Sequence, residues 1–138
     1  MSNFTSPMPP NAPTVLLVDD DDFLREIMGE MLSQLGVSTV YQAGNGLEAL
    51  AMLKTMPAPP DFLICDIYMP DMDGIEFVAE LGKLHFQGGV MLLSGVNPET
   101  LQLARDIAAG EGIKLVGAYL KPIPPELLAD ALGLKPTA

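Results

Sequence analysis

The sequence predicts an α/β fold: one doubly wound sheet of five parallel strands with helices on both faces. Short apolar runs alternate along the chain with longer segments whose apolar residues recur at helical spacing. Strands that alternate with helices pair in parallel, because each helix returns the chain to the same end of the sheet. The chain has 138 residues, 49% of them apolar, so it can bury one sizeable core.

The apolar runs are the predicted strands. The first, TVLLV, is rich in valine and leucine and ends at an aspartate. The second, STVYQA, alternates in the manner of a strand, and the third, DFLICDI, is almost continuously apolar, as expected of a strand buried on both faces. In chain order the predicted strands cover residues 14–18, 38–43, 61–67, 89–95 and 114–120.

The segments after the strands are the predicted helices. In the first, Phe23, Ile27, Met31 and Leu35 share one helical face, and Gly36 ends the segment. The third is weaker because a glycine interrupts it, and the fifth has prolines in its first turn, where a helix tolerates them. In chain order the predicted helices cover residues 21–36, 45–56, 74–85, 97–112 and 124–134.

Polar residues mark the starts of these helices. Asn45 and Asn97 are candidate N-caps of the second and fourth helices. Asp21 and Asp22 are expected to be a cap and a solvated surface residue. Outside the helices and strands, residues 1–13 are predicted to form a disordered arm and residues 135–138 a short tail, so residues 14–134 form the domain.

The net charge of −11 disfavours two classes of partner. Nucleic acids and anionic membrane surfaces attract Lys and Arg, whereas this chain carries 7 basic and 18 acidic residues. No stretch approaches the ~20 apolar residues of a membrane span, and the first residues lack the features of a signal peptide. The single cysteine cannot form an internal disulfide, which favours a reducing compartment. The sequence therefore predicts a cytoplasmic protein.

Reactive side chains follow four of the five predicted strands. Asp19 and Asp20 open a run of four aspartates after the first strand, and Asp66 follows the apolar part of the third. Ser94 ends the fourth strand, and Lys121 follows the fifth. Each residue alone is common in turns and caps. Because the carboxyl ends of parallel strands meet at one edge of the sheet, we expect the five side chains to form one site.

This set of side chains fits phosphoryl transfer. Clustered carboxylates repel one another and favour a cation, and Mg²⁺ prefers carboxylate, phosphate and water oxygens. Asp19 and Asp20 are candidate metal ligands, and Asp66 is a candidate nucleophile that could form an aspartyl phosphate. Ser94 and Lys121 are candidate partners of the phosphoryl oxygens.

Four segments resemble, in order and spacing, the receiver domain of bacterial two-component response regulators. They are VLLVDD, LICDIYMPDMDGIEF, VMLLSG and YLKPI. The block D-x-x-M-P-x-M-D-G at residues 66–74 is highly specific. The resemblance covers residues 14–134 and implies a stand-alone receiver domain. The implied fold is flavodoxin-like, a (βα)5 sheet with strand order 2-1-3-4-5.

The resemblance also implies a metal site. Asp20, Asp66 and the backbone carbonyl of Tyr68 would bind Mg²⁺, the expected cofactor, directly. Asp19 would act mainly through a metal-bound water. Asp66 looks like the phospho-acceptor of the family.

The remaining residues of the motifs would hold the phosphoryl group. Ser94 would donate a hydrogen bond to it and move towards it, and Lys121 would pair with it. The Lys121–Pro122 peptide bond is expected to be cis, which aims the lysine at the site. Residues 69–70 and 73–74 would shape the loop after the third strand.

The function that the resemblance implies is a signalling switch. A sensor histidine kinase or a histidine phosphotransfer protein would donate the phosphoryl group, and a change of shape would reach an unknown downstream protein. The chain would not be an enzyme beyond catalysing its own phosphorylation and dephosphorylation. No DNA or membrane partner is expected, no output domain follows, and a homodimer is left open.

One position departs from the family pattern. Many members carry Tyr or Phe three residues before the lysine, where this chain has Ala118 followed by Tyr119. Since strand side chains alternate, Tyr119 is predicted to point to the opposite face from Ala118. Ser94 and residues 95–98 are therefore expected to carry the change of shape, with the next helix shifting. That helix, the fifth strand and the last helix would form the partner-binding surface.

Two other interpretations remain open. Residues 71–74, DMDG, resemble the nucleophile motif of haloacid-dehalogenase-type phosphatases, but that motif should directly follow an apolar strand, and here Asp66 does so. The second alternative is an adaptor that no longer accepts a phosphoryl group.

Cys65 is expected to be a small core residue and His85 a surface residue.

Overall fold

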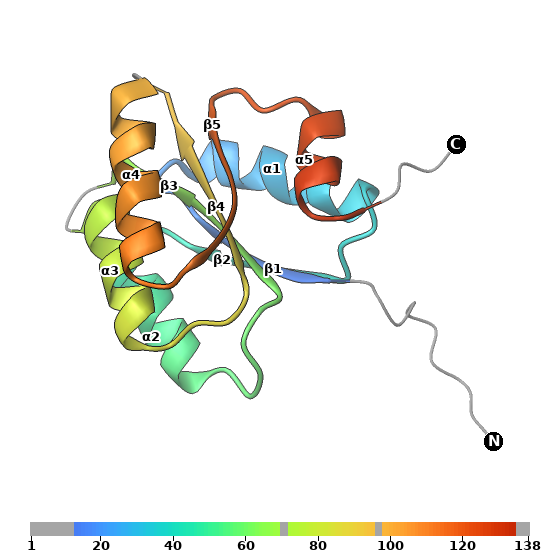
Figure 1. Ribbon diagram of the computed structural model, residues 1–138. Coiled ribbons are helices and arrows are strands. Elements are labelled where there is room, and N and C mark those ends of the chain that lie inside the picture. The colour runs from blue at the N-terminus through green and yellow to red at the C-terminus, as the bar shows by residue number, and fades with distance from the viewer. Residues whose placement is uncertain (1–12, 70–71, 96–97, 135–138) are drawn as a thin grey trace.

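Five parallel strands form one sheet in the computed structural model (Figure 1), which describes residues 13–69, 72–95 and 98–134. The strands pair in the order β2-β1-β3-β4-β5, and every pairing is parallel. They are β1 (Thr14–Val18), β2 (Thr39–Ala43), β3 (Phe62–Asp66), β4 (Gly89–Ser94) and β5 (Lys114–Leu120). The predicted fold class and strand order are therefore confirmed.

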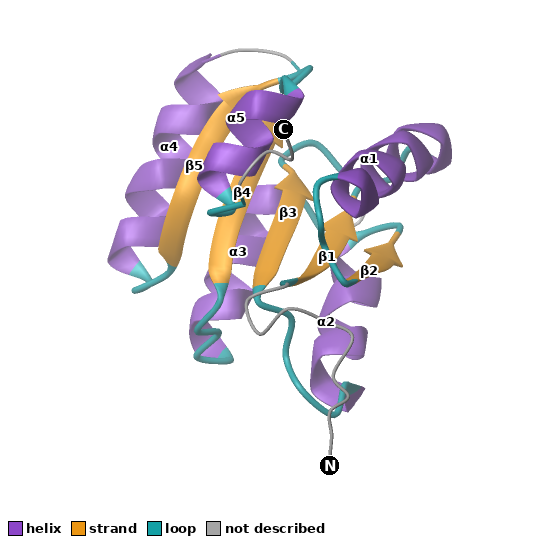
Figure 2. Cartoon of the chain, turned by 90° about the vertical axis from the view of Figure 1, so that its right-hand side faces the viewer, coloured by secondary structure: helices purple, strands orange, loops and turns teal. Residues whose placement is uncertain are grey.

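Five helices within the described residues cover the two faces of the sheet. Figure 2 shows α1 and α5 on one face and α2, α3 and α4 on the other. They are α1 (Asp22–Gln34), α2 (Gly46–Thr55), α3 (Gly74–Lys83), α4 (Pro98–Gly110) and α5 (Pro125–Ala131). This is the doubly wound arrangement that the alternation of strands and helices predicted.

The sheet carries an apolar core on each face, because successive strand side chains point to opposite faces. Leu16 and Phe77 belong to the core under α2, α3 and α4. Leu17, the next residue along β1, belongs with Leu128 to the core under α1 and α5. The central strands β1, β3 and β4 are therefore buried on both faces, as their apolar runs predicted.

Side-chain caps start three of the helices. Asp21 accepts hydrogen bonds from the backbone amides of Phe23 and Leu24 at 3.0 and 3.1 Å, and so begins α1. Asn45 accepts from the amide of Glu48 at 2.8 Å, as predicted for α2, and Asp73 caps α3 in the same way. Capping places the chain at a fixed angle where it leaves each strand edge.

All five predicted helices are longer than the observed ones, and the third and fifth end early at residues with positive φ angles. The third was predicted to extend to His85, but α3 ends at Lys83, and His85 has a φ of 57°, which a helix does not permit. The fifth was predicted over residues 124–134, whereas α5 covers Pro125–Ala131, with Gly133 at a φ of 70°. The predicted cap Asn97 lies outside the described residues.

Gly82 does not interrupt α3. A Cβ at this position would lie 2.5 Å from a carboxylate oxygen of Glu111 and 2.9 Å from its Cβ, so the glycine allows the turn after α4 to pack closely on α3. The prediction that Gly82 weakens the helix is therefore wrong, because the glycine has a packing role in the structure.

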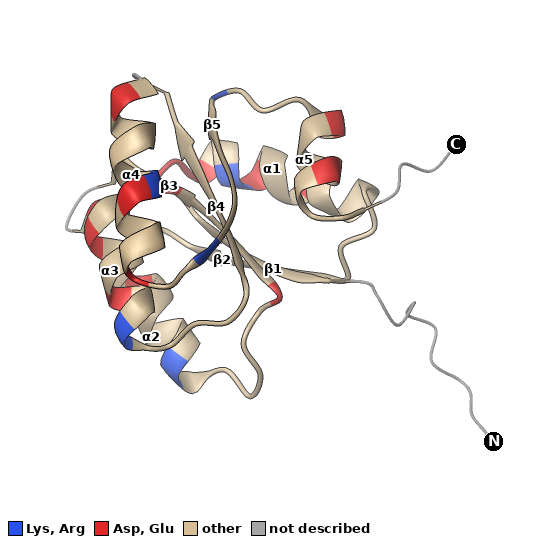
Figure 3. Cartoon of the chain, in the orientation of Figure 1, with Lys and Arg blue, Asp and Glu red and all other residues tan. Residues whose placement is uncertain are grey.

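Acidic residues outnumber basic residues in this chain, 18 to 7. Figure 3 shows Asp and Glu positions on α1, α3, α4 and α5. None of the helices that the structure describes has the length and apolar character to cross a membrane. The predicted arm and tail fall almost entirely outside the described residues, although Pro13 is buried and its carbonyl accepts a hydrogen bond from the amide of Ser38 at 2.8 Å.

Candidate functional site

The candidate site lies at the carboxyl edge of the sheet. Asp19 and Asp20 directly follow β1, Asp66 is the last residue of β3, and Ser94 is the last residue of β4. Lys121 directly follows β5. Since all strands are parallel, these residues share one edge, as predicted from the sequence.

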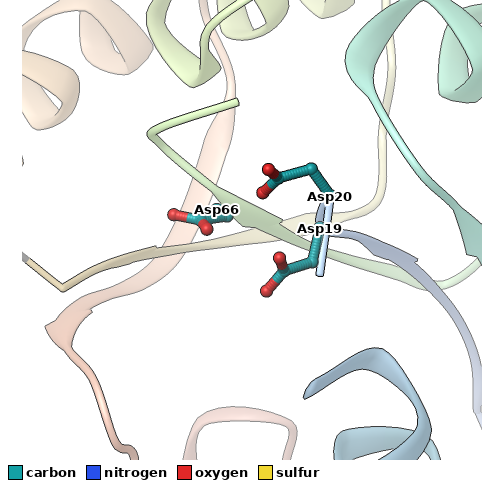
Figure 4. Close-up of side chains that lie close together, drawn as sticks. All are labelled: Asp19, Asp20 and Asp66. Atoms are coloured by element: carbon teal, nitrogen blue, oxygen red, sulfur yellow. The ribbon is translucent and has the colours of Figure 1, made fainter. Parts of the chain in front are cut away.

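Three carboxylates come together at this edge. Asp19, Asp20 and Asp66 each offer an oxygen, and these oxygens lie within 4.8 Å of one another. Figure 4 shows the three side chains next to each other at the ends of β1 and β3. Asp66 is 8% exposed, while Asp20 is open to solvent. Hard oxygen donors at this spacing, with one side open, suit a divalent cation such as Mg²⁺.

Lys121 is the cation that the chain itself places in this site. Its Nζ donates to Oδ2 of Asp66 at 2.8 Å and to Oδ2 of Asp19 at 3.1 Å. Its backbone amide donates to the carbonyl of Ser94 at 2.8 Å, which ties the turn after β5 to the end of β4. The Lys121–Pro122 bond is cis, as predicted.

Burial and charge pairing shift the pKa values of Asp66 and Lys121 in opposite directions. Burial raises the pKa of Asp66 above its ordinary value, and the hydrogen bond and charge of Lys121 only partly offset this. Burial lowers the pKa of Lys121, but its hydrogen bonds and charge interactions with Asp66 and Asp19 outweigh burial and raise the pKa overall. The ammonium therefore stays protonated beside a carboxylate that ionises reluctantly.

Ser94 and Tyr68 lie on either side of Asp66. Asp66 pairs with Leu93 of β4, so Ser94 is one residue further along the neighbouring strand, where it is fully buried. The backbone amide of Tyr68 donates to Oδ1 of Asp66 at 3.2 Å. One carboxylate oxygen thus contacts the loop after β3 and the other contacts Lys121.

The loop after β3 turns tightly beneath Asp66. The amide of Gly74 donates to the carbonyl of Ile67 at 2.7 Å, and a Cβ at Gly74 would lie 2.7 Å from Cα of Ile67 and 3.1 Å from the carbonyl oxygen of Asp66. Met69 is buried, whereas Pro70 and Asp71 lie outside the described residues. Only glycine allows the start of α3 to approach Asp66 this closely.

Cys65 and His85 lie where the sequence predicted them, the first in the core and the second on the surface. Cys65 is fully buried in the core under α2, α3 and α4, where burial raises the pKa of its thiol well above the ordinary value. His85 is exposed at the end of α3. Neither lies among the side chains that form the site.

Two contacts of the site were missed by sequence reasoning. Arg25 on α1 donates to the backbone carbonyl of Asp19 at 2.5 Å. The hydroxyl of Tyr68 shares a hydrogen bond of 2.8 Å with Oγ1 of Thr100 on α4. The i, i+3 spacing of Asp22 and Arg25 signalled an ion pair within α1, but it did not signal the contact with the Asp19 carbonyl. The second joins residues 32 positions apart and had no local signal.

Comparison with known proteins gives consistent similarities. A family model described as the response regulator receiver domain matches residues 15–132. The chain is 30% identical over 121 residues to the chemotaxis protein CheY of Halobacterium salinarum, a match that covers 88% of this chain and 98% of that protein. It is 32% identical over 120 residues to the probable C4-dicarboxylate response regulator DctR of Bacillus subtilis, covering 86% of this chain but only 50% of that protein.

Two further matches extend this set. The sensor histidine kinase CheAY of Helicobacter pylori is 42% identical over 81 residues, which is 59% of this chain and 10% of the kinase. Among solved structures, the chemotaxis protein CheY4 of Vibrio cholerae crystallised at pH 4.0 superposes with a TM-score of 0.71 at 30% identity, covering 88% of this chain and 96% of that one.

Proposed function

The chain belongs to the response regulator receiver domain family, and we propose that Asp66 is its phospho-acceptor, charged by a histidine kinase or a histidine phosphotransfer protein. The observation that carries the proposal is the setting of Asp66. Its buried carboxylate ends β3, 2.8 Å from the Lys121 ammonium and beside the Asp19 and Asp20 carboxylates. A signalling switch of this kind is not a conventional enzyme.

Asp66 supplies the nucleophile. One carboxylate oxygen forms a bond to phosphorus while the P–N bond of the donor's phosphohistidine breaks, and the imidazole nitrogen keeps the bonding electron pair. Lys121, already within hydrogen-bond distance of Asp66, is placed to donate to a phosphoryl oxygen. The hydroxyl of Ser94, at the end of the neighbouring strand, is the second donor.

Asp20, Asp66 and the backbone carbonyl of Tyr68 would hold Mg²⁺, with Asp19 acting mainly through a water. The donor set fits this ion, since three carboxylates offer oxygens within 4.8 Å of one another. When bound, Mg²⁺ supplies positive charge that offsets the carboxylates and the transferred phosphoryl group. Lys121 holds Asp66 and Asp19 in place by its two hydrogen bonds.

The hydrolase alternative has less support. In that alternative Asp73 is the second aspartate of the D-x-D-G motif, but its carboxylate caps α3 by accepting from the amide of Glu76 at 2.9 Å. Asp71, the nucleophile of that motif, lies outside the described residues. The contacts of Asp66 with Lys121 favour Asp66 as the nucleophile.

Incubation with acetyl phosphate and Mg²⁺ distinguishes the three possibilities. A receiver forms one acid-labile adduct per chain, a hydrolase releases phosphate steadily, and an inert adaptor does neither. We expect an adduct that is lost in Asp66→Asn and in excess EDTA, and kept in the exposed surface variant Asp130→Asn. Labelling that survives Asp66→Asn would show that another residue is the nucleophile.

The partners are proposed at the level of class. The similarity to part of a sensor histidine kinase supports a phosphohistidine donor. We propose that the surface of α4, β5 and α5 binds the downstream protein. Mixing the chain with phosphorylated kinase domains of its host, with Asp66→Asn as the control, identifies the donor by transfer of radiolabelled phosphate.

A further inference from the structure

Arg25 holds the acidic end of β1 from outside the carboxylate cluster. Its Nη1 donates to the backbone carbonyl of Asp19 at 2.5 Å, and its Nε donates to Oε1 of Gln42 on β2 at 3.2 Å. Its Nη2 pairs with Oδ1 of Asp22 on α1 at 2.5 Å. The charged side chain is only 15% exposed. Acceptors at the end of β1, on β2 and on α1 therefore fix the guanidinium group of Arg25.

The Asp19 carbonyl is the atom through which this contact reaches the metal site. It belongs to the peptide unit that joins Asp19 to Asp20, and a peptide unit is planar. A donor that fixes this carbonyl therefore also fixes the direction in which the chain continues to Asp20. On the other side, the amide of Asp19 donates to the carbonyl of Ala43 at 3.2 Å.

We propose that Arg25 is a positioning residue for the divalent metal site. It holds the Asp19–Asp20 peptide unit so that both carboxylates face Asp66, and it is not itself a metal ligand. This inference rests on the function proposed above, because it assumes that the cluster binds Mg²⁺. The planar fork of arginine reaches three acceptors at once, which a lysine ammonium on a flexible stem does not reproduce.

Charge alone predicts the opposite result. A positive charge near a cation site repels the cation, so removing the charge of Arg25 would strengthen Mg²⁺ binding if the field were its main effect. Positioning predicts weaker binding instead. Arg25→Lys separates the two most clearly, since it keeps the charge and loses the fork.

The test is a Mg²⁺ titration of the full chain by isothermal titration calorimetry, with no phosphoryl donor present. We expect Arg25→Lys and Arg25→Met to raise the Kd for Mg²⁺ about tenfold, the lower end of the range for residues that orient metal ligands. Arg105, the other arginine of the chain, also donates to a backbone carbonyl, that of Ala118 at 3.0 Å. Arg105→Lys and Arg105→Met are the matched controls and should leave the Kd unchanged.

A third variant tests positioning without any change of charge. Gln42→Leu removes one anchor of Arg25 and should weaken Mg²⁺ binding less than the arginine variants do. Thermal melting without metal identifies the variants that are folded at the titration temperature, and Arg25→Lys and Gln42→Leu suffice if Arg25→Met does not fold. An unchanged Kd in Arg25→Lys, or a lower Kd in Arg25→Met, would overturn the inference. A wild-type chain that binds no Mg²⁺ would overturn the proposed metal site as well.

Discussion

At the scale of single residues, the role proposed for Asp66 requires a carboxylate that is both buried and reactive. Its exposure of 8% would protect the proposed acyl phosphate from bulk water, but the same burial raises the pKa of the carboxyl. Lys121 lowers the free energy of the ionised form through a hydrogen bond of 2.8 Å. Since the pKa remains raised, ionised Asp66 is destabilising in the metal-free fold.

The first prediction is that Asp66→Asn stabilises the metal-free protein at pH 7. A folded pKa above the unfolded one means that the stabilising contribution of Asp66 is complete below about pH 3.8 and is lost as the pH rises through the raised value. Asparagine resembles the protonated acid and escapes that loss. Urea unfolding in EDTA should show a higher free energy of unfolding for the variant at pH 7 and a smaller difference at pH 4.

Asp130→Asn, an exposed substitution of the same kind, is the control and should change little at either pH. A variant Asp66→Asn that is less stable than wild type at pH 7 would mean that the bond to Lys121 outweighs burial.

The residues of the site differed in how far the sequence could predict them. Asp66 could be found because an apolar run ends there, and Lys121 because it follows a strand and precedes a proline. Arg25 could not, because its role depends on Gln42 and the Asp19 carbonyl, which approach it only after the sheet and α1 have packed. Strand-end residues carry a local signal, whereas residues that support them from a neighbouring element do not.

At the scale of elements, the first residue of α3 lies against the backbone at the end of β3. A side chain at Gly74 would meet the backbone of Ile67 at 2.7 Å, and backbone cannot move aside as a flexible side chain can. The position of α3 relative to Asp66 therefore depends on the absence of a Cβ atom at Gly74.

The second prediction uses a pair of glycine variants. Gly74→Ala should lower the free energy of unfolding by about 1–3 kcal/mol, the usual effect of overpacking, and should slow labelling by acetyl phosphate. Gly110→Ala, at the end of α4 with nothing within 4 Å of the new Cβ, should raise stability by at most about 1 kcal/mol. Equal stabilities of the two variants would show that the start of α3 can move away without cost.

A hydrogen bond also joins the loop after β3 to α4. The Tyr68 hydroxyl and the Thr100 hydroxyl are 2.8 Å apart, although the tyrosine is 44% exposed. If α4 shifts when a phosphoryl group binds, as the sequence led us to expect, this bond breaks. Its energy then opposes the active state.

The third prediction follows from that linkage. Tyr68→Phe should tighten beryllofluoride binding about two- to fivefold, the equivalent of one exposed hydrogen bond of about 0.5–1 kcal/mol. Unchanged affinity would mean that α4 keeps its contact with Tyr68 in both states.

The placement of Tyr119 agrees with the sequence prediction. Ala118 is buried in the core under α2, α3 and α4, while Tyr119 packs against the core on the opposite face. Its ring lies over Gly117, where a Cβ would meet it at 2.3 Å. A ring on this face does not border α4. Ser94 and α4 therefore remain the expected route by which phosphorylation changes the shape of the chain. NMR shifts that change on beryllofluoride binding only at Tyr119 would contradict this route.

At the scale of the whole molecule, the candidate site joins parts of the chain that are far apart in sequence. Asp19 and Lys121 are 102 residues apart, and Asp66 lies between them in both sequence and sheet. A ligand bound by these residues in the folded state alone therefore stabilises the complete fold by mass action.

The fourth prediction is a rise in the melting temperature of the whole domain with Mg²⁺. At a free concentration ten times its Kd, the ion should add about 1.4 kcal/mol to the free energy of unfolding. Asp20→Ala, which removes the most exposed carboxylate of the cluster, should show little of this increase. A melting temperature that rises equally in both proteins would point to screening of the net charge of −11 instead.

The fold was more predictable than the helix ends. Short continuous apolar runs that alternate with helical segments are typical of central parallel strands, so the sheet could be predicted from the sequence. The ends of α3 and α5 did not, because His85 and Gly133 adopt positive φ angles that depend on how the next segment packs.

The strand order also has a consequence for synthesis on the ribosome. After β1 and β2 have paired, the strand order allows β3, β4 and β5 to join in the order in which they emerge, each at the same growing edge. Every residue of β4 is buried in the finished protein, so a nascent or truncated chain that stops before Lys114 exposes an unpaired edge of apolar residues. We expect chaperones and proteases to bind such fragments, and we expect this binding to stop once β5 covers the edge of β4.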